Sequence, residues 1–423
     1  MTFQEAVNIG LKNNIDLKQQ QNQQFANQAA KTAEIASIAP TISARAQASR
    51  TRGNSFNQNE GQVVNGTFDQ ISSSINANMT LFNSFSRLNS IRRADYRLTA
   101  QQHRVQRTTQ DIISLVSNQY LTVLVDKEIL SIAEKTLESQ LQQLEQIKEQ
   151  VALGTVAEVD QISQIATVKN QEYTVLQAEN RLRNDKVTLA QTLQIDPTID
   201  FEVEEPDWNL NSVNFDDIEL ESLYNTALEK RADLKLFENL EGSAKMDLAI
   251  SKADFYPTLS GSFFNGTQFN SLKDQPEDRG FNDQFFTDNT FRGFAMTLNV
   301  PIFSGMRNRS AFVQAKVAHQ NAILDKQNTE LNVKSEVLRA YLNFKDAVLS
   351  YQRATVGLES SKLAYELQKE SYSLGSANLV QYTIANIEYV NAQANLSQAR
   401  YTLIFQKILL DYAVGVITPE DIP

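Results

Sequence analysis

Two kinds of hydrophobic periodicity alternate along the chain, in the same order, in each half. Amphipathic helical patterns open each half, and in the first half Pro40 ends them. Strict alternation of polar and apolar residues then covers about 41–51 and 70–82, and again about 258–267 and 291–303. This period of two predicts strands with one polar and one apolar face. The Gly- and Asn-rich stretches between the paired strands are typical of loops.

A helical period then returns and persists, over about 84–194 in the first half and about 305–415 in the second. Residues 84–152 contain no Pro or Gly, so they predict one helix of about 100 Å. Seven-residue spacing favours coiled-coil packing between an outgoing and a returning helix. The heptad positions are Leu130, Leu137, Leu144 and Val151 in one half and Tyr351, Leu358, Tyr365 and Tyr372 in the other.

The two halves are copies of one unit. Residues 3–18 match residues 220–235 at a constant offset, and the long helical segments match at a second constant offset. The fold expected is therefore mainly α with β, built from a duplicated helix–strand–strand–long helical hairpin unit. We divide the chain into a first repeat, 1–195, an acidic linker, 196–217, and a second repeat, 218–423.

A short phrase interrupts both long helical patterns at matching positions. It reads Leu153-Gly154-Thr155 in the first repeat and Leu374-Gly375-Ser376 in the second. Glycine supplies the positive φ that ends a helix, and the hydroxyl residue is expected to cap the helix that follows. Both phrases are thus predicted to be hairpin tips. A plain turn would by itself explain the glycine, so a functional role for the tips is a second interpretation beside it.

Composition removes several classes of function. The chain of 423 residues has 39 Lys and Arg against 50 Asp and Glu, a net charge of −11, which disfavours nucleic-acid binding. It has no cysteine and two histidines without ligand spacing, so we expect no metal and no cofactor. No phosphate-binding glycine loop or catalytic triad pattern is present, so we expect no enzyme. The polar start implies a cytoplasmic protein or a leader removed before Met1.

The strands predict an assembly. Four strands of about ten residues cannot close a barrel, whereas twelve strands from three copies would close one around an open lumen. The aromatic residues Phe281, Phe285, Phe286 and Phe291 beside the second loop fit an interfacial belt or a small local core. The candidate lipid-facing residues are Ile42, Ile71, Ile75, Met79, Phe294, Met296 and Leu298.

These features together resemble the TolC-type outer-membrane efflux and secretion channels. The resemblance rests on the duplication, on the passage from helix through proline to strand, and on the phrases VPIFSGMRNR, LGTVAEVD and LGSANLVQY. It implies a homotrimer with a 12-stranded transmembrane β-barrel on a long coiled-coil α-helical barrel. It also implies a passive exit duct of a tripartite efflux or type I secretion system, in the outer membrane of a Gram-negative bacterium, with the helical part in the periplasm and the signal peptide removed.

The same resemblance assigns partners and residues. The tips, residues 153–155 and 374–376, would dock a periplasmic adaptor that connects the duct to an inner-membrane pump, and the linker would join an equatorial belt. Ala377, Gln381 and Ile384 replace charged residues of the family's prototype, so we expect a gate with fewer charged contacts. The alternative function is a soluble coiled-coil filament or surface-appendage protein. The periplasmic gate residues implied are Gln143, Asp160, Tyr372 and Gln381.

Overall fold

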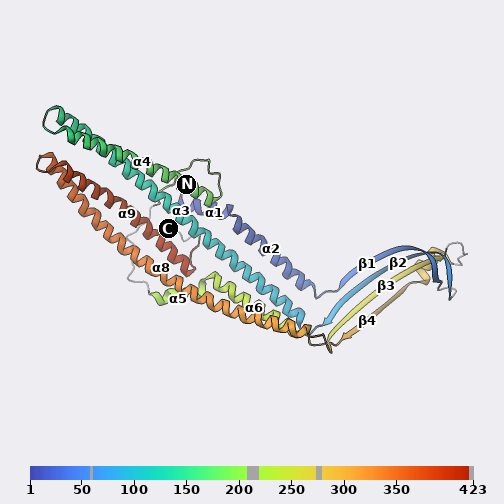
Figure 1. Cartoon of the computed structure of the whole chain (residues 1–423). Helices are drawn as coiled ribbons and strands as arrows, with labels where there is room; N and C mark the ends of the chain where they lie inside the picture. Colours follow the sequence, from blue (N-terminus) through green and yellow to red (C-terminus); the bar gives the residue numbers. More distant parts are fainter. Residues whose placement is uncertain (58–60, 207–218, 273–278, 419–423) are drawn as a thin grey trace. The chain divides into compact units, whose positions relative to one another are not determined.

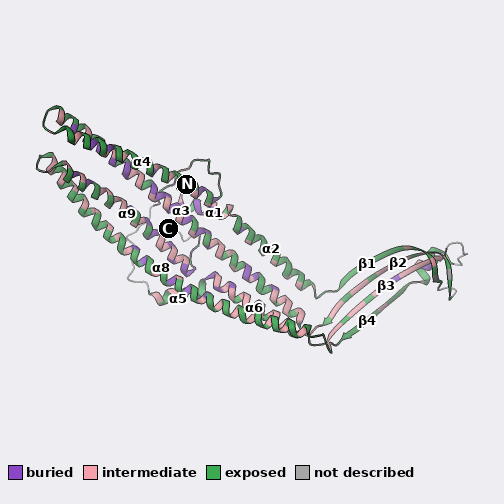
Figure 2. Ribbon diagram, in the orientation of Figure 1, coloured by how far each residue is buried: buried purple, intermediate pink, exposed green. Residues whose placement is uncertain are grey.

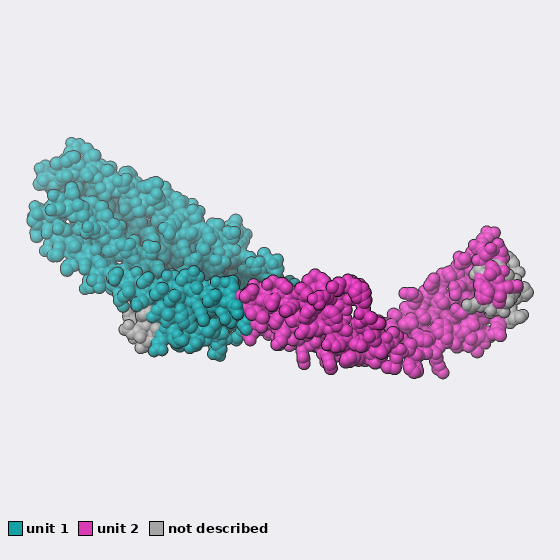
Figure 3. All heavy atoms as spheres, turned by 60° about the horizontal axis from the view of Figure 1, so that its bottom comes forward, with its two compact units in different colours: residues 1–23, 102–236, 326–423 teal, residues 24–101, 237–325 magenta. Residues whose placement is uncertain are grey.

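The computed structural model describes residues 1–57, 61–206, 219–272 and 279–418 (Figure 1). It divides into two compact units, one formed by residues 1–23, 102–236 and 326–423 and the other by residues 24–101 and 237–325 (Figure 3). The elements are α1 (Phe3–Asn13), α2 (Ile15–Ala36), β1 (Thr41–Asn57), β2 (Gln62–Phe82), α3 (Ser86–Ala152), α4 (Glu158–Leu193), α5 (Leu220–Lys230), α6 (Ala232–Ala253), β3 (Thr258–Leu272), α7 (Phe281–Asp283), the π-helical turn η2 (Gln284–Asp288), β4 (Phe291–Asn299), α8 (Arg307–Ser373) and α9 (Leu379–Val414).

The strands form one antiparallel sheet in the order β1-β2-β3-β4. The strands of the first repeat are longer than expected, because most of the stretch read as a loop continues the ladder to the pair Asn57 and Gln62. The alternation of polar and apolar residues that predicts strands is weak there, because both faces of this part carry polar residues. Part of the second predicted loop, 273–278, lies outside the described residues.

β4 ends at Asn299, four residues before the predicted end at 303. Pro301 has no N–H for a ladder, so the apolar alternation of Val300 and Ile302 continues in sequence but not in the sheet. Ile302 is 95 % exposed. The apolar pattern therefore overstated the length of this strand.

All seven candidate lipid-facing residues lie on one face of the sheet. The register pairs Ile42 with Ala77 and Leu259 with Leu298, and residues directly opposite each other share a face. Phe294, Met296 and Leu298 are 80, 61 and 64 % exposed within the single chain. The sheet therefore presents an uncovered apolar face, which follows from the period of two.

The aromatic residues beside β3 form a local cluster. Phe281 stacks on Phe285 with ring centroids 5.0 Å apart and meets Phe269 of β3 edge-on at 5.1 Å. Where β4 no longer reaches, the buried side chain of Gln284 accepts from the Asn270 N–H at 3.2 Å. Asn289 donates to the carbonyl of Gln268 at 2.9 Å. Phe281, Phe285 and Phe286 thus pack on one another beside the β3 edge, whereas Phe291 contacts Phe264 instead.

The unit formed by residues 1–23, 102–236 and 326–423 is called the helical unit below. It contains α4, α9 and most of α3 and α8, which form the antiparallel hairpins α3–α4 and α8–α9 with buried positions along their contacts (Figure 2). The predicted heptad residues Leu130, Leu137, Leu144 and Val151 are only partly buried. The buried seven-residue series on α3 is instead Ala133, Gln140 and Ile147, at 4, 5 and 0 % exposure. An apolar heptad search missed this seam because glutamine occupies a buried position in it. Among the described residues, no helix has both the length and the apolar character needed to cross a membrane.

Two apolar clusters hold the helical unit. The first joins α1, α3 and α4 around Tyr120 and Leu189 and also includes Ile404 of α9, and the second joins α5, α8 and α9 around Phe344 and Leu410, so α9 contributes to both. The described part of the predicted linker belongs to the first cluster, because Val203 is 1 % exposed. Residues 207–217 of that linker lie outside the described residues. This segment therefore contributes to the apolar core and does not only connect the two repeats.

Gly10 allows α1 to approach α3 closely. A Cβ atom placed on Gly10 would lie 2.8 Å from Cγ2 of Val116 and 3.4 Å from Cδ2 of Leu193, and both neighbours are fully buried. Neither neighbour has free space beside it, so a methyl group here must displace packed side chains.

We predict that Gly10→Ala destabilises the protein by about 1–3 kcal/mol through this overlap, despite the better helix propensity of alanine. The measurement is the midpoint of chemical unfolding followed by circular dichroism in detergent. Gly357→Ala is the matched control, because Gly357 is also helical but has nothing within 4 Å of its Cβ position. The control should be neutral or stabilised by up to about 1 kcal/mol; equal midpoints for both variants would contradict the close approach.

Candidate functional site

The two hairpin tips have nearly the same geometry. Gly154 and Gly375 have φ values of +73° and +74°, and their N–H groups donate to the carbonyls of Val151 and Tyr372 at 2.9 and 3.0 Å. This is the pattern of a Schellman motif, in which a left-handed residue ends the helix. The preceding leucines, Leu153 and Leu374, are 78 and 76 % exposed. Each tip thus presents a leucine side chain from a rigid turn.

The tip hydroxyl groups close the preceding helix, which corrects the expectation that they cap the following one. Thr155 and Ser376 each donate both their N–H and their hydroxyl to one carbonyl five residues earlier, with all four distances between 2.9 and 3.0 Å. The N-cap of α4 is Ala157, which makes no side-chain cap bond. A hydroxyl directly after glycine lies too early in the turn to reach the next helix.

Gln381 forms the start of α9. Its N–H donates to Oδ1 of Asn378 at 2.9 Å, and its own Oε1 accepts from the Asn378 N–H at 3.2 Å. This reciprocal pair is a capping box, which satisfies two N–H groups that have no partner within the helix. Within one chain the side chain of Gln381 therefore stabilises the helix start.

The structure brings together the other three predicted gate residues. Tyr372 of α8 is only partly exposed and faces Gln143 of α3 and Asp160 in the first turn of α4. Burial and then the charge of Asp160 raise the pKa of Tyr372, while hydrogen bonding with Gln143 lowers it. Within one chain the side chain of Gln143 and the charge of Asp160 thus both act on the Tyr372 hydroxyl.

Tyr372 belongs to a stack of four tyrosines between α8 and α9. Tyr372 stacks on Tyr382 at 5.5 Å, Tyr382 contacts Tyr365 at 5.8 Å, and Tyr365 stacks on Tyr389 at 5.2 Å. We did not identify Tyr382 and Tyr389 from the sequence. The sequence did contain a signal. Tyr365 and Tyr372 are seven residues apart on α8, as are Tyr382 and Tyr389 on α9, so each pair lies on one side of its helix.

The stack also reaches α3. Tyr382 is 3 % exposed and its burial raises the pKa of the phenol, with the Tyr365 hydroxyl adding to the rise and hydrogen bonding to Ser139 opposing it. Ser139 and Gln143 are one turn apart on α3. Two consecutive rings of the stack, Tyr372 and Tyr382, therefore meet consecutive turns of the other hairpin.

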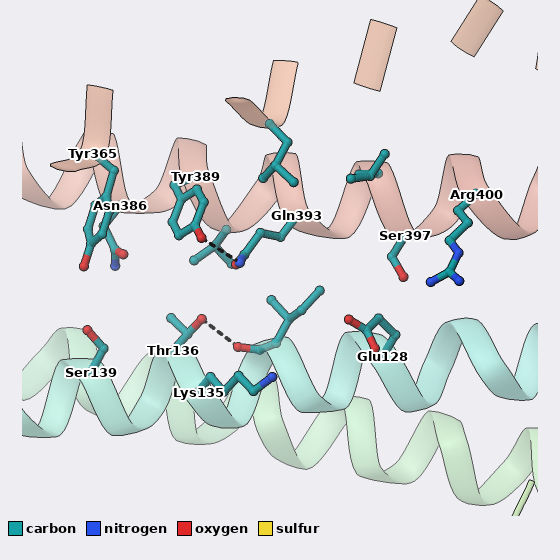
Figure 4. Close-up of a pocket in the computed structure, with 14 residues that line it drawn as sticks. Glu128, Lys135, Thr136, Ser139, Tyr365, Asn386, Tyr389, Gln393, Ser397 and Arg400 are labelled. Atoms are coloured by element: carbon teal, nitrogen blue, oxygen red, sulfur yellow. Dashed lines mark hydrogen bonds between the residues drawn. The ribbon is translucent and has the colours of Figure 1, made fainter. Parts of the chain in front are cut away.

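A cavity of about 320 Å³ lies beside this stack, between α3 and the α8–α9 hairpin (Figure 4). Tyr389 accepts a hydrogen bond from Gln393 at 3.0 Å on one wall. Mixed polar and apolar side chains line it, so the two hairpins meet here through an incompletely filled and largely polar contact. Other lining residues include Glu128, Lys135, Thr136, Ser139, Tyr365, Asn386, Ser397 and Arg400.

A buried arginine joins the second repeat at the junction between α5 and α6. Arg231 is 1 % exposed; it forms a two-bond pair with Asp233, at 2.9 and 2.5 Å, and donates to Glu336 at 2.7 Å. It also donates to the carbonyl of Ala413 at 3.0 Å. Burial alone would raise the pKa of Asp233, but the hydrogen bond and charge of Arg231 hold that pKa below its usual value. Such a pair orders the elements around it.

A buried carboxyl group lies between α3 and α4. The side chain of Asp126 is fully buried, with Nε of Arg181 2.9 Å from its Oδ1, and neither carboxyl oxygen has a well-aligned hydrogen bond from the described residues. Burial, and then the neighbouring carboxyl group of Asp185, raise the pKa of Asp126 to about 7, although Arg181 opposes the rise. Among the described residues, no group of three His, Asp or Glu side chains is placed to hold a metal ion.

The chain belongs to the outer membrane efflux protein family, whose sequence model matches residues 6–193 and 223–416. This is a family of channel proteins of the outer membrane, which favours the efflux reading of the sequence over a soluble coiled-coil filament. The expected resemblance to TolC-type channels is thereby confirmed.

Individual relatives agree with this membership. The chain is 24 % identical to the outer membrane protein TolC of Salmonella enteritidis over 74 % of its own length, and this match spans 62 % of that protein. It is 23 % identical to TolC of Vibrio cholerae over 87 % of its own length and 82 % of that protein. The chain thus spans less than two thirds of the Salmonella relative.

Solved structures show the same fold. VceC, an outer membrane protein of Vibrio cholerae, superposes with a TM-score of 0.82 at 17 % identity, covering 98 % of this chain and 96 % of that one. The CmeC outer membrane channel of Campylobacter jejuni gives 0.79 at 19 % identity, covering 98 and 85 %. The strand pairs and the long helical hairpins are therefore those of TolC-type channels.

We predict that stability falls by about 2 kcal/mol as the pH rises from 4 to 7, because the folded state favours protonated Asp126. The pKa of Asp126 is raised to about 7 in the folded chain, so its contribution is present below the usual carboxyl pKa and is lost through pH 7. Unfolding midpoints across this range should lose most of that slope in Asp126→Asn.

The matched control is Glu145→Gln, because Glu145 forms only an exposed ion pair with Lys148. It should keep the slope of the unmodified protein. An unchanged slope in Asp126→Asn would show that the buried carboxyl does not carry the effect.

Proposed function

We propose that three copies of this chain form a passive outer-membrane exit duct for a tripartite efflux or type I secretion system, with no catalytic step. The observation that carries the proposal is the sheet with the order β1-β2-β3-β4, whose two outer edges have no strand partner among the described residues. In a bilayer, unpaired backbone groups cost several kcal/mol each, so an open sheet must find partners or close.

A homotrimer satisfies those edges. Three sheets of four strands give a closed barrel of twelve, in which β4 of one copy lies beside β1 of the next. The antiparallel order supports this arrangement, because β4 and β1 run in opposite directions. Membership of the outer membrane efflux protein family supports the location, with the helical unit in the periplasm.

The two faces of the sheet fit two different solvents. The face with Ile42, Phe294 and Met296 would contact lipid, since its side chains are apolar and uncovered in the single chain. The opposite face carries Ser72, Ser74, Asn76 and other polar residues, and would line a water-filled lumen.

The hairpin tips would bind a periplasmic adaptor that leads to the inner-membrane pump. Leu153 and Leu374 provide exposed apolar anchors, and the Schellman turns hold them in matching positions. Exposed leucines on rigid turns lose little entropy when they bind, which suits a docking surface.

The contact of Tyr372 with Gln143 and Asp160 would act as the periplasmic gate, because it joins the α8–α9 hairpin to the α3–α4 hairpin near the tips. Opening then requires the hairpins to separate and exchange these contacts for water. The few charged groups here make the closed state depend mainly on hydrogen bonds and on stacking of aromatic rings.

Replacing Gly154 and Gly375 with valine is predicted to abolish adaptor-dependent export while trimers remain in the outer membrane. Both glycines have positive φ, which valine adopts at a cost of at least about 1 kcal/mol each, so the tips should change shape. The measurements are export in cells and the mass of the detergent-extracted assembly by ultracentrifugation, with electron microscopy for a central hole.

Gly305→Val is the matched control, because Gly305 also has positive φ and open space but precedes α8 instead of following it. It should retain export. Normal export by the double tip variant would reduce the tips to simple turns, and solitary compact particles in the unmodified protein would contradict the duct.

We predict that Tyr372→Phe increases the open-to-closed ratio about fivefold in planar bilayers, because it removes the hydroxyl that interacts with Gln143 and Asp160, a polar contact worth about 1 kcal/mol. The measurement is single-channel conductance and open probability. Tyr389→Phe is the matched control, since its hydroxyl accepts only from Gln393 on the same helix in the described contacts. Identical traces for both variants would remove Tyr372 from the gate and leave the duct intact.

A further inference from the structure

Phe264 and Phe291 lie close together on the polar face of the sheet, where the alternating pattern does not explain them. Phe263 and Phe264 are consecutive in β3 and so point to opposite faces. Phe263 pairs with Phe294 on the apolar face, whereas Phe264 pairs with Gly293 on the polar one. Phe291 of β4 lies on the polar face as well, opposite Gly266.

Each of these two rings lies over a glycine of the neighbouring strand. A Cβ atom on Gly293 would be 2.7 Å from Cζ of Phe264, and one on Gly266 would be 2.6 Å from Cζ of Phe291. The ring centroids are 6.4 Å apart. Any side chain at either glycine would displace a ring. Because the glycines lack a side chain, both phenyl rings can pack directly on the neighbouring strand.

The surroundings of this pair are polar. The register places Asn76 of β2 beside Phe264 and Ser74 beside Gly266, and Arg45 of β1 beside Ser74. Within the single chain Phe291 is 50 % exposed. The two phenyl rings thus form a partly exposed aromatic surface surrounded by polar side chains.

Strand stability alone is a weak reason for this arrangement. Covering a glycine with an aromatic ring does stabilise a strand pair, but a β-branched residue at both glycines would do so without leaving a phenyl group in water. The sequence instead has two glycines and two phenylalanines in one small patch. Such a fixed, half-exposed aromatic pair is suited to stacking against another planar apolar group.

We propose that Phe264 and Phe291 form a contact site for planar aromatic molecules in transit through the barrel. This inference rests on the proposed function, in which the polar face lines the lumen and three copies bring six phenyl groups to one level. The site deepens that function by favouring cargo with aromatic rings over cargo of similar charge without them.

The test uses the purified trimer in planar bilayers, with ethidium as the aromatic cation and tetraethylammonium as the non-aromatic one. Ethidium should produce current blockades, and their mean duration should fall about threefold to tenfold in Phe264→Leu/Phe291→Leu and in Phe264→Ser/Phe291→Ser. The leucine variant keeps apolar volume on the glycines, so it separates loss of the ring from loss of the sheet.

The matched control is Phe263→Leu/Phe294→Leu, which changes the paired rings on the other face. It should leave ethidium blockades unchanged, and tetraethylammonium should behave alike in all variants. Equal ethidium blockades in the unmodified protein and in either assembled Phe264/Phe291 variant would overturn the site. Failure of both variants to assemble would assign the rings a structural role and overturn it too.

Cysteine labelling separates this inference from the proposed function. The chain has no cysteine, so Phe264→Cys and Phe263→Cys each introduce a single thiol. A charged, water-soluble thiol reagent should reduce the current through Phe264→Cys and leave Phe263→Cys unaffected. If Phe264→Cys does not react, the polar face does not line the lumen and the duct is wrong; if it reacts while ethidium blockades are unchanged, only the aromatic site is wrong.

Discussion

The constraint on which the structure depends is the need to pair the backbone groups at the edges of its sheet. β1 offers an outer edge of 17 residues and β4 one of nine, and in the part of the chain that the structure describes neither edge has a strand beside it. The protein covers some of the edge of β3 itself, through Gln284 and Asn289 where β4 no longer reaches. The remaining edges and the exposed apolar face make identical copies the simplest partners, since antiparallel neighbours then repeat around the ring.

Both repeats have the same arrangement of helices and strands, but they differ in their helix caps and polar contacts. The tips agree closely, because a Schellman turn needs a residue with positive φ and glycine adopts that conformation most readily. The helix starts beyond them differ, since α9 has a capping box and α4 begins at Ala157 without a side-chain cap. The second repeat also carries the buried Arg231, whereas the matching Asn14 of the first repeat accepts the Leu17 N–H. The two repeats therefore share their tip turns and differ in helix capping and in buried polar contacts.

Near the tips, the contacts within the α3–α4 hairpin and between the two hairpins are largely polar. Gln140 of α3 and Gln164 of α4 are buried and hydrogen-bonded to each other, and the tyrosine stack of α8 and α9 meets α3 at Ser139. Such contacts specify the register of the helices yet can exchange partners with water at modest cost, since each hydrogen bond contributes about 1 kcal/mol net. A fully apolar seam would resist separation more strongly. The polar seam and the neighbouring cavity are therefore consistent with hairpins that must move apart.

The sequence by itself determined the duplicated unit, the tips, the strands with one apolar face and the absence of thiol chemistry, because these follow from local periodicity and residue type. Only the tertiary structure decided the true seam of α3, the length of β1 and β4, and the stack around Tyr382. Those features depend on which groups meet across the fold: Gln140 is buried because Gln164 reaches it, and the ring of Phe264 covers Gly293 because that residue has no Cβ. Patterns along one segment cannot report a partner that comes from another.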